Sequence, residues 1–165
     1  MTEVWKLIEG YENYSVSTYG QVRNDKTKKV LKGTKDESGR LSFGFYKKQR
    51  FLIHRLVALA FIENLEDKSE VDHIDNDPSN NRVENLRWAT RNENAMNTRV
   101  RTDNTSGIKG VRWNKLYQKW EAYINIDKIK NHLGCYNTIE EATLARQTRA
   151  NLAFGIFTNA CESLC

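Results

Sequence analysis

The sequence predicts an α+β protein made of several small modules, and three observations lead to this prediction. Strand-like segments dominate residues 1–62, and a run rich in Asp, His and Asn occupies residues 71–100. From residue 104 onward, three more strand-like segments precede a helix. We therefore expect modules at residues 1–66, 67–103 and 104–157, followed by a loosely attached tail at residues 158–165.

Composition argues against membrane and secreted proteins. Of the 165 residues, 39% are hydrophobic, and no run approaches the 18 apolar residues of a membrane-spanning helix. The start of the chain has no basic segment followed by an apolar one, so no secretory signal is expected. The odd set Cys135, Cys161 and Cys165 predicts neither a disulfide framework nor a thiolate metal site. We expect a cytoplasmic, non-secreted protein without a membrane partner.

The charge distribution favours a polyanionic partner. Lys and Arg number 26 against 21 Asp and Glu, which gives a net charge of +5. Residues 1–70 and 101–165 are net basic, and residues 71–100 are slightly acidic. This pattern suits a chain that grips a polyanion at both ends and holds a cation in the middle. A solvated basic face is the alternative.

The first two modules have recognisable strand and helix signals. Residues 41–46 alternate apolar and polar side chains, residues 51–53 supply a hairpin partner, and residues 54–63 form an apolar helix. Residues 86–89 predict a short strand, and Thr90 with Glu93 forms a capping box that starts a helix at Arg91.

The third module reads as a three-stranded antiparallel sheet packed on one helix. Strands are expected at residues 107–113, 119–126 and 128–136, and a second capping box at residues 138–141 opens a helix to about Phe154. Ala142, Ala145, Thr148 or Arg149, and Leu152 recur along it at helical spacing.

The candidate site lies in the second module. Asp72 and His73 are adjacent at the end of a predicted strand, and Asn85 follows His73 by 12 positions. Asn94 lies one turn into the capped helix, and the Asn-rich loop between the strands folds the chain back. A carboxylate, an imidazole and a carboxamide should therefore surround one point. An isolated Asp-His pair is usually an ordinary pair of surface residues, and asparagines in loops usually form turns. It is the joint spacing of these residues that indicates a site. His54, at the start of an apolar helix, is expected to be packed structurally.

These residues resemble the HNH nuclease motif, a ββα-metal fold, as found in phage and intron-encoded homing endonucleases. The motif residues are Val71–Asn76, Asn80, Asn81, Asn85–Trp88 and Asn94. Residues 5–22 and the helix start at 54–58 resemble the modular segment that precedes HNH in that group. Residues 106–155 resemble the APETALA-type DNA-binding domain, through the segments at residues 110–113, 119–122, 133–134 and 140–142.

The resemblance implies a role for each motif residue. It makes His73 the general base, Asp72 and Asn94 the metal ligands, and Asn85 the residue that holds the loop in place. The last position is Asn where the eponymous motif has His, which weakens the cation site. Hard oxygen ligands suit one Mg²⁺ or Mn²⁺ per active site. Because only Asp72 is charged, substrate phosphates must complete the coordination, and metal and DNA should bind with positive coupling.

Basic and aromatic side chains are expected to grip double-stranded DNA. The predicted contacts in the third module are Arg112, Trp113, Lys115, Lys119 and Trp120, and those in the first are Lys47, Lys48 and Arg50. Two alternatives stay open: Trp113 and Trp120 as core residues under the helix, and the basic runs, including residues 26–32, as solvated faces.

The expected function is that of a metal-dependent DNA endonuclease, a monomer that nicks selected sites as homing enzymes do. A catalytically silent, sequence-specific DNA-binding regulator is the alternative, and Asn94 is the feature that supports it. A non-specific degradative nuclease is disfavoured by the appended recognition domain.

Overall fold

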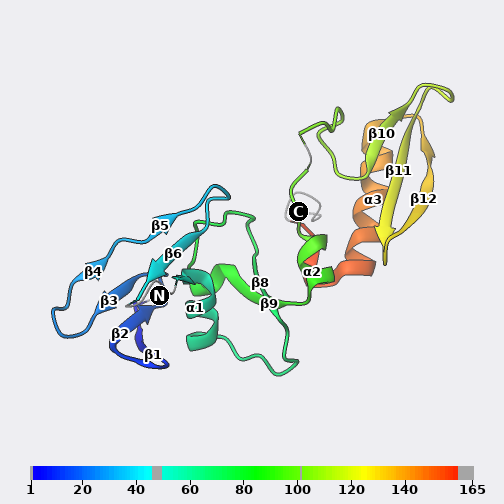
Figure 1. Ribbon diagram of the computed structural model, residues 1–165. Coiled ribbons are helices and arrows are strands. Elements are labelled where there is room, and N and C mark those ends of the chain that lie inside the picture. The colour runs from blue at the N-terminus through cyan, green and yellow to red at the C-terminus, as the bar shows by residue number, and fades with distance from the viewer. Residues whose placement is uncertain (1, 46–49, 101, 160–165) are drawn as a thin grey trace. The chain divides into compact units, whose positions relative to one another are not determined.

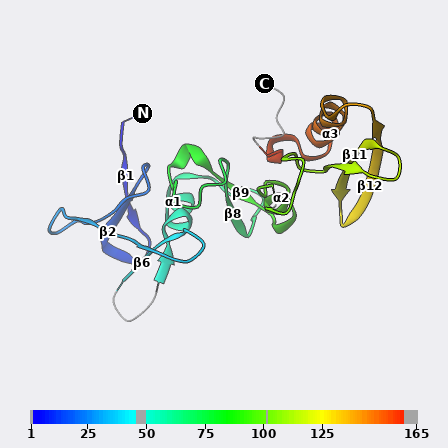
Figure 2. The same cartoon turned by 90° about the horizontal axis from the view of Figure 1, so that it is seen from above.

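The computed structural model describes residues 2–45, 50–100 and 102–159. Contacts between residues divide the chain into two compact units, residues 1–91 and 92–165. Figures 1 and 2 show the two units in perpendicular views, with the strands and helices labelled. Within the described part of the chain, no helix has the length and apolar character that a membrane span requires.

Two antiparallel sheets and one helix form most of the first unit. The first sheet has the order β1-β2-β3-β4, and the second has the order β5-β6-β7. These strands have the bounds β1 (Trp5–Ile8), β2 (Tyr11–Ser17), β3 (Val22–Asn24), β4 (Val30–Leu31), β5 (Thr34–Lys35), β6 (Leu41–Gly44) and β7 (Arg50–Leu52). Strand β7 leads directly into helix α1 (Ile53–Phe61).

A two-stranded antiparallel sheet completes this unit. Strand β8 (Glu70–His73) pairs with β9 (Leu86–Ala89), and a short 3₁₀ helix, η1 (Val83–Asn85), precedes β9. One hydrophobic core joins these strands to the N-terminal sheet and to α1. It includes Ile8, Val16, Val57, Val71 and Trp88. The indole nitrogen of Trp88 also donates to the carbonyl of Ile62, at 3.0 Å. The core that supports β8 and β9 is therefore built largely from the N-terminal segment. The boundary expected at residue 66 stays a prediction.

The second unit contains a three-stranded sheet and a long helix. Strands β10 (Val111–Asn114), β11 (Lys119–Ile126) and β12 (Ile129–Tyr136) pair antiparallel in that order. Helix α3 (Ile139–Phe154) begins at a capping box, in which the Thr138 hydroxyl accepts from the Glu141 backbone. The 3₁₀ helix η2 (Gly155–Phe157) follows it. Helix α2 (Arg91–Met96) begins at the last residue of the first unit, and its other residues belong to the second.

The buried face of α3 does not follow the apolar spacing of its sequence. Its buried residues are Ala142, Arg146, Ala150 and Phe154, a strict i, i+4 row. Leu152, which lies at helical spacing from Ala142, is 76% exposed. The physical reason is that Arg146 is buried on the sheet side, with its guanidinium 5.9 Å from the centre of the Phe154 ring. A long apolar stem allows an arginine to occupy such a row, and apolar periodicity alone misses it.

The expected tail at residues 158–165 is wrong at its first two positions. Thr158 and Asn159 are buried. The Asn159 amide donates to the backbone carbonyls of Asn97 and Thr98, at 3.1 and 3.0 Å. The amide thus binds the backbone that immediately follows α2 and fixes residue 159 to it. Residues 160–165 lie outside the described part.

Candidate active site

The register of β8 and β9 places the central acid and imidazole. Asp72 lies opposite Arg87, and His73 lies opposite Leu86. Adjacent strand residues point to opposite faces, but His73 is the last residue of β8, where the chain turns into the Asn-rich loop. The strand end therefore carries a buried carboxylate beside a half-buried imidazole.

Asp72 is paired with an arginine that the sequence analysis did not assign. The Arg87 Nη2 and Nε atoms lie 2.6 and 2.8 Å from Asp72 Oδ2, and Asp72 is 4% exposed. Both contacts engage one carboxylate oxygen, and the guanidinium offsets the carboxylate charge. A signal existed in the sequence, because pairing the two predicted strands places Arg87 directly opposite Asp72.

Asn85 closes the loop between the two strands. Its Oδ1 accepts from the Asp75 backbone at 3.1 Å, and its Nδ2 donates to Asp75 Oδ1 at 2.9 Å and to the Asn80 carbonyl at 2.8 Å. Burial raises the pKa of Asp75, but hydrogen bonds from the Asp77 backbone, Asn80 and Asn85 outweigh it and lower that pKa below its ordinary value. The Asn85 carboxamide thus holds Asp75 and Asn80, at the two ends of this loop segment, close together.

His73 is held between two side chains that sequence reasoning did not connect with it. Its Nε2 lies 3.0 Å from Asn81 Oδ1, and Asn81 is buried. The His54 ring meets the His73 ring edge to face, with centroids 4.9 Å apart. Burial, then the neighbouring His73, lowers the pKa of His54 to about 4. His54 is therefore a neutral, packed imidazole at neutral pH, and its structural assignment agrees with its burial.

The donor set for a metal ion is sparse. In the residues that the structure describes, no group of three His, Cys, Asp or Glu side chains could hold a metal ion. Asp72 offers a hard carboxylate oxygen at the end of β8, which fits Mg²⁺ or Mn²⁺. Asn94 belongs to the second unit, so its part in the same coordination sphere stays a prediction. A single buried carboxylate beside an arginine suits an ion that shares its coordination with a bound phosphate.

The predicted DNA contacts of the third module divide between the two faces of the sheet. Arg112 and Lys119 lie on the face away from α3, where Arg112 Nη2 is 2.8 Å from Glu121 Oε2. Trp113 and Trp120 alternate to the other face and meet edge to face at 5.3 Å. Trp120 packs against the core, whereas Trp113 is 43% exposed. Lys115 is exposed in the turn between β10 and β11.

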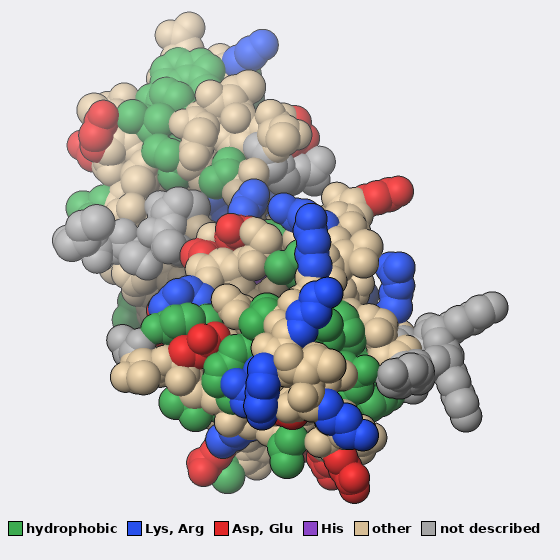
Figure 3. Space-filling model, turned by 90° about the vertical axis from the view of Figure 1, so that its left-hand side faces the viewer, with side chains coloured by type: hydrophobic (Ala, Val, Ile, Leu, Met, Phe, Trp, Pro, Cys, Tyr) green, Lys and Arg blue, Asp and Glu red, His purple; other side chains and the backbone are tan. Residues whose placement is uncertain are grey.

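Basic side chains of the first unit are exposed in the hairpin between β3 and β4. Lys26, Lys28 and Lys29 are solvent-exposed there, and Lys32 is exposed just after β4. Lys and Arg side chains are numerous on the face seen in Figure 3. Arg50 is exposed at the start of β7. Lys47 and Lys48 lie outside the described residues.

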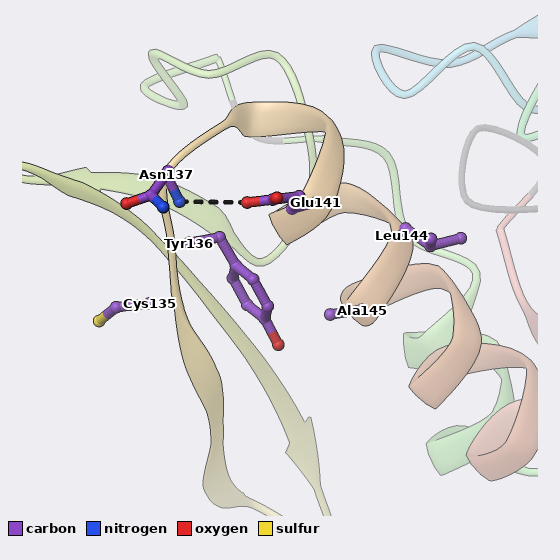
Figure 4. Close-up of a pocket in the computed structure, with 6 residues that line it drawn as sticks. All are labelled: Cys135, Tyr136, Asn137, Glu141, Leu144 and Ala145. Atoms are coloured by element: carbon purple, nitrogen blue, oxygen red, sulfur yellow. Dashed lines mark hydrogen bonds between the residues drawn. The ribbon is translucent and has the colours of Figure 1, made fainter.

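A pocket of about 480 Å³ lies in the second unit, between the end of β12 and α3. Figure 4 shows its lining, in which the Asn137 backbone donates to Glu141 at 3.2 Å. Cys135, Tyr136, Leu144 and Ala145 complete it. None of the predicted catalytic or metal-binding residues lines this pocket.

Comparison with known proteins matches both halves of the first unit. Residues 51–96 match a model of the HNH endonuclease family, and residues 3–46 match the NUMOD4 motif. The chain is also 33% identical to the solved structure titled "DNA binding and cleavage by the HNH homing endonuclease I-HmuI". That match covers 86% of this chain and 82% of the other, with a TM-score of 0.54. This chain belongs to the HNH endonuclease family.

Other members of the HNH endonuclease family come from viruses and phages. An HNH endonuclease of Acanthamoeba polyphaga mimivirus is 43% identical over 103 residues, which cover 58% of this chain and 26% of that protein. DNA endonuclease I-HmuI of Bacillus phage SP01 is 41% identical over 97 residues, which cover 56% of each. The chain thus spans only about a quarter to a half of the full length of these two relatives.

Proposed function

We propose that this HNH family member is a metal-dependent endonuclease that hydrolyses phosphodiester bonds in double-stranded DNA. The observation that carries the proposal is the imidazole of His73 at the end of β8, beside the buried Asp72 and oriented by Asn81. Phosphodiester hydrolysis requires a general base and a hard oxygen ligand for the metal ion, held close together. One short segment of this chain contains both, next to a loop that hydrogen bonds hold in place.

In the proposed reaction, His73 takes a proton from the attacking water. The water oxygen forms a bond to phosphorus as the bond to the 3′-oxygen breaks. The leaving 3′-oxygen takes a proton from solvent, which leaves a 5′-phosphate and a 3′-hydroxyl. Asp72 and Asn94 would hold one Mg²⁺ or Mn²⁺, which when bound supplies Lewis-acid stabilisation of the developing charge. Arg87 fixes the carboxylate of Asp72, and Asn85 fixes the loop that follows His73.

DNA binding is proposed for the basic surfaces of both units. Lys115, Lys119 and Arg112 of the second unit, in a module of APETALA type, would contact phosphates or base edges. Arg112 forms an ion pair with Glu121. A DNA phosphate must therefore displace the Glu121 carboxylate from the guanidinium or bind the guanidinium together with it. With one catalytic centre per chain, we propose a site-selective, homing-type enzyme that acts as a monomer and nicks one strand.

The test uses supercoiled plasmid and phage-type genomic DNA with the full chain in Mg²⁺, Mn²⁺ or EDTA. We expect metal-dependent nicks at discrete positions that disappear in His73→Ala and persist in the control His132→Ala. His132 is suitable because its side chain is 55% exposed in the other unit. DNA that is bound but intact in both metals would instead identify a binding-only regulator, and random degradation would contradict site selectivity.

A further inference from the structure

We propose that the turn at residues 18–20 of the N-terminal sheet positions His73 for base catalysis through the buried side chain of Asn81. This inference rests on the proposed endonuclease function and assigns a catalytic task to the N-terminal segment. Asn81 and Gly20 are then positioning residues, and His73 remains the group that acts on the water.

The first observation is the close approach of Gly20 to Asn81. Gly20 has φ +76°, and a Cβ added there would lie 2.6 Å from the Asn81 Cβ and 2.7 Å from its carbonyl oxygen. Real Cβ atoms do not tolerate these distances, and the neighbouring atoms are backbone and the rigid start of a side chain. Only glycine lets the turn come this close to Asn81.

Two more contacts fix the same turn to the residues that follow Asn81. The Val83 backbone donates to the Thr18 carbonyl at 2.9 Å. The Arg82 guanidinium lies 4.2 Å from the centre of the Tyr19 ring. All three consecutive residues of the turn therefore contact the segment 81–83, and each uses a different kind of interaction. This arrangement specifies the position of that segment relative to the sheet.

Asn81 transmits this position to His73. Its side chain is buried at 3% exposure, and its Oδ1 lies 3.0 Å from His73 Nε2. In the described structure, its Nδ2 is buried without a hydrogen-bond partner, so the amide acts through its oxygen. A carbonyl oxygen only accepts, so Nε2 must carry the hydrogen. The lone pair that can take a proton from water is then on Nδ1.

The His54 ring limits the remaining freedom of the His73 ring. The two centroids are 4.9 Å apart at an interplanar angle of 69°, and His54 is itself buried in α1. A hydrogen bond at Nε2 and an aromatic contact with His54 therefore both restrict the His73 ring. Both contacts come from the first unit, so the orientation of the imidazole is set without the second unit.

The direct test is the protonation pattern of His73 in the full-length protein without metal or DNA. Long-range ¹H–¹⁵N correlation NMR, at a pH where the imidazole is neutral, shows which nitrogen carries the hydrogen. We expect Nε2–H in the wild type and in Asn81→Asp, because a carboxylate oxygen also accepts, and a mixture of tautomers in Asn81→Ala. Nδ1–H in the wild type, or an unchanged tautomer in Asn81→Ala, would overturn the proposal even if the protein cleaves no DNA.

The kinetic test compares two glycines that share a backbone conformation. Gly20→Ala places a methyl group against Asn81, whereas Gly10 has φ +77° and open space at its Cβ within the described residues. Both variants carry the same backbone penalty, and only Gly20→Ala disturbs Asn81. We expect Gly20→Ala and Asn81→Ala to lower kcat by about 10²-fold with KM for DNA nearly unchanged, as for a misplaced catalytic group.

The controls separate positioning from folding. Gly10→Ala should keep kcat within about twofold and should lose less thermal stability than Gly20→Ala, which adds a steric clash to the same backbone penalty. Asn81→Asp should recover most of the rate lost in Asn81→Ala. If Gly20→Ala does not fold, the comparison of kcat between Asn81→Ala and Asn81→Asp alone tests whether Asn81 positions His73. Equal kcat in Gly20→Ala and Gly10→Ala, or no recovery by Asn81→Asp, would refute the role of the turn. Loss of cleavage in the wild type would instead refute the nuclease function.

Discussion

Arg87 and Asp72 lie directly opposite each other on β9 and β8, with Arg87 Nη2 2.6 Å from Asp72 Oδ2. Their side chains are 14% and 5% exposed, so the pair is nearly withdrawn from water. A carboxylate buried in this way is costly unless its partner is present. The arginine thus makes it possible to keep the proposed metal ligand Asp72 inside the fold, and it limits the affinity of that carboxylate for a cation.

Removing the charge of Asp72 should destabilise the first unit far more than removing an exposed charge. Asp72→Asn leaves the buried Arg87 without its anion, and we expect a loss of about 3 kcal/mol in the free energy of unfolding. The matched control is Glu84→Gln, whose pair with Arg82 is exposed and should lose less than about 1 kcal/mol. Urea unfolding measures both. Equal losses would contradict the buried-pair assignment.

His54 should make the first unit sensitive to mild acid. Its pKa is about 4 in the folded protein, below the ordinary value of 6.5, so the unfolded chain binds the proton more readily. Stability from this group is fully present above pH 6.5 and is lost as the pH falls toward 4, by about 3 kcal/mol in total. Amide hydrogen exchange in β8 and β9 at pH 7 and 4.5 measures this loss. His54→Phe should remove most of the difference, and the exposed His132→Gln should preserve it.

Asn85 and Asn64 offer a matched pair of loop clamps. Asn64 bridges its loop through Lys68, accepting at 2.8 Å and donating at 2.9 Å, much as Asn85 bridges residues 75–80. Alanine at either position should cost about 1–3 kcal/mol in unfolding free energy. Only Asn85→Ala should also reduce cleavage, by about tenfold or more, because its loop adjoins His73. Similar cleavage by the two variants would show that the Asn85 clamp is merely structural.

Gly110 should tolerate no side chain, in contrast with Gly107. Both have positive φ, +73° and +72°, but a Cβ at Gly110 would lie 2.4 Å from the Tyr123 carbonyl oxygen and 2.5 Å from Arg146 Nε. Gly107→Ala should cost about 1 kcal/mol, and Gly110→Ala a further 1–3 kcal/mol, because it also displaces packed atoms. Thermal unfolding of the second unit compares them, and equal melting temperatures would contradict the close approach.

Metal and DNA should bind cooperatively. With Asp72 already paired to Arg87, the chain alone should bind Mg²⁺ weakly, and phosphate oxygens should raise that affinity. Isothermal titration of Mg²⁺ into the chain with and without duplex DNA, using His73→Ala to prevent turnover, measures the coupling. Reciprocity requires Mg²⁺ to strengthen DNA binding by the same factor. Identical Mg²⁺ affinities in the two titrations would rule out a shared coordination sphere.

Family membership and the strand that carries Asp72 and His73 could be predicted because they depend on local patterns. The spacing of Asp72, His73 and Asn85 is short, and β9 and β11 have the predicted bounds, residues 86–89 and 119–126. The contact of Gly20 with Asn81 joins residues 61 positions apart, and no local pattern encodes it.

Side-chain chemistry accounts for the other differences. Leu152 has helical spacing with Ala142, yet the buried row of α3 passes through Arg146, whose apolar stem does the packing. Asn159 resembles a residue of a polar tail, but its amide finds two backbone acceptors near α2. In both cases a polar residue is buried through interactions that depend on tertiary structure.

The hydrophobic core shared by β1, β2, α1, β8 and β9 also limits how such a gene can be rearranged. Ile8 and Val16 pack with Val71 and Trp88, so a recombination joint between residues 46 and 70 would pair half of a core with a foreign half. A joint after residue 96 leaves that core whole and keeps the proposed metal ligand Asn94 on the same side as Asp72. Exchange of the proposed DNA-binding region between related genes should therefore succeed after α2 and fail before β9, and the N-terminal segment should be inherited together with the proposed nuclease centre.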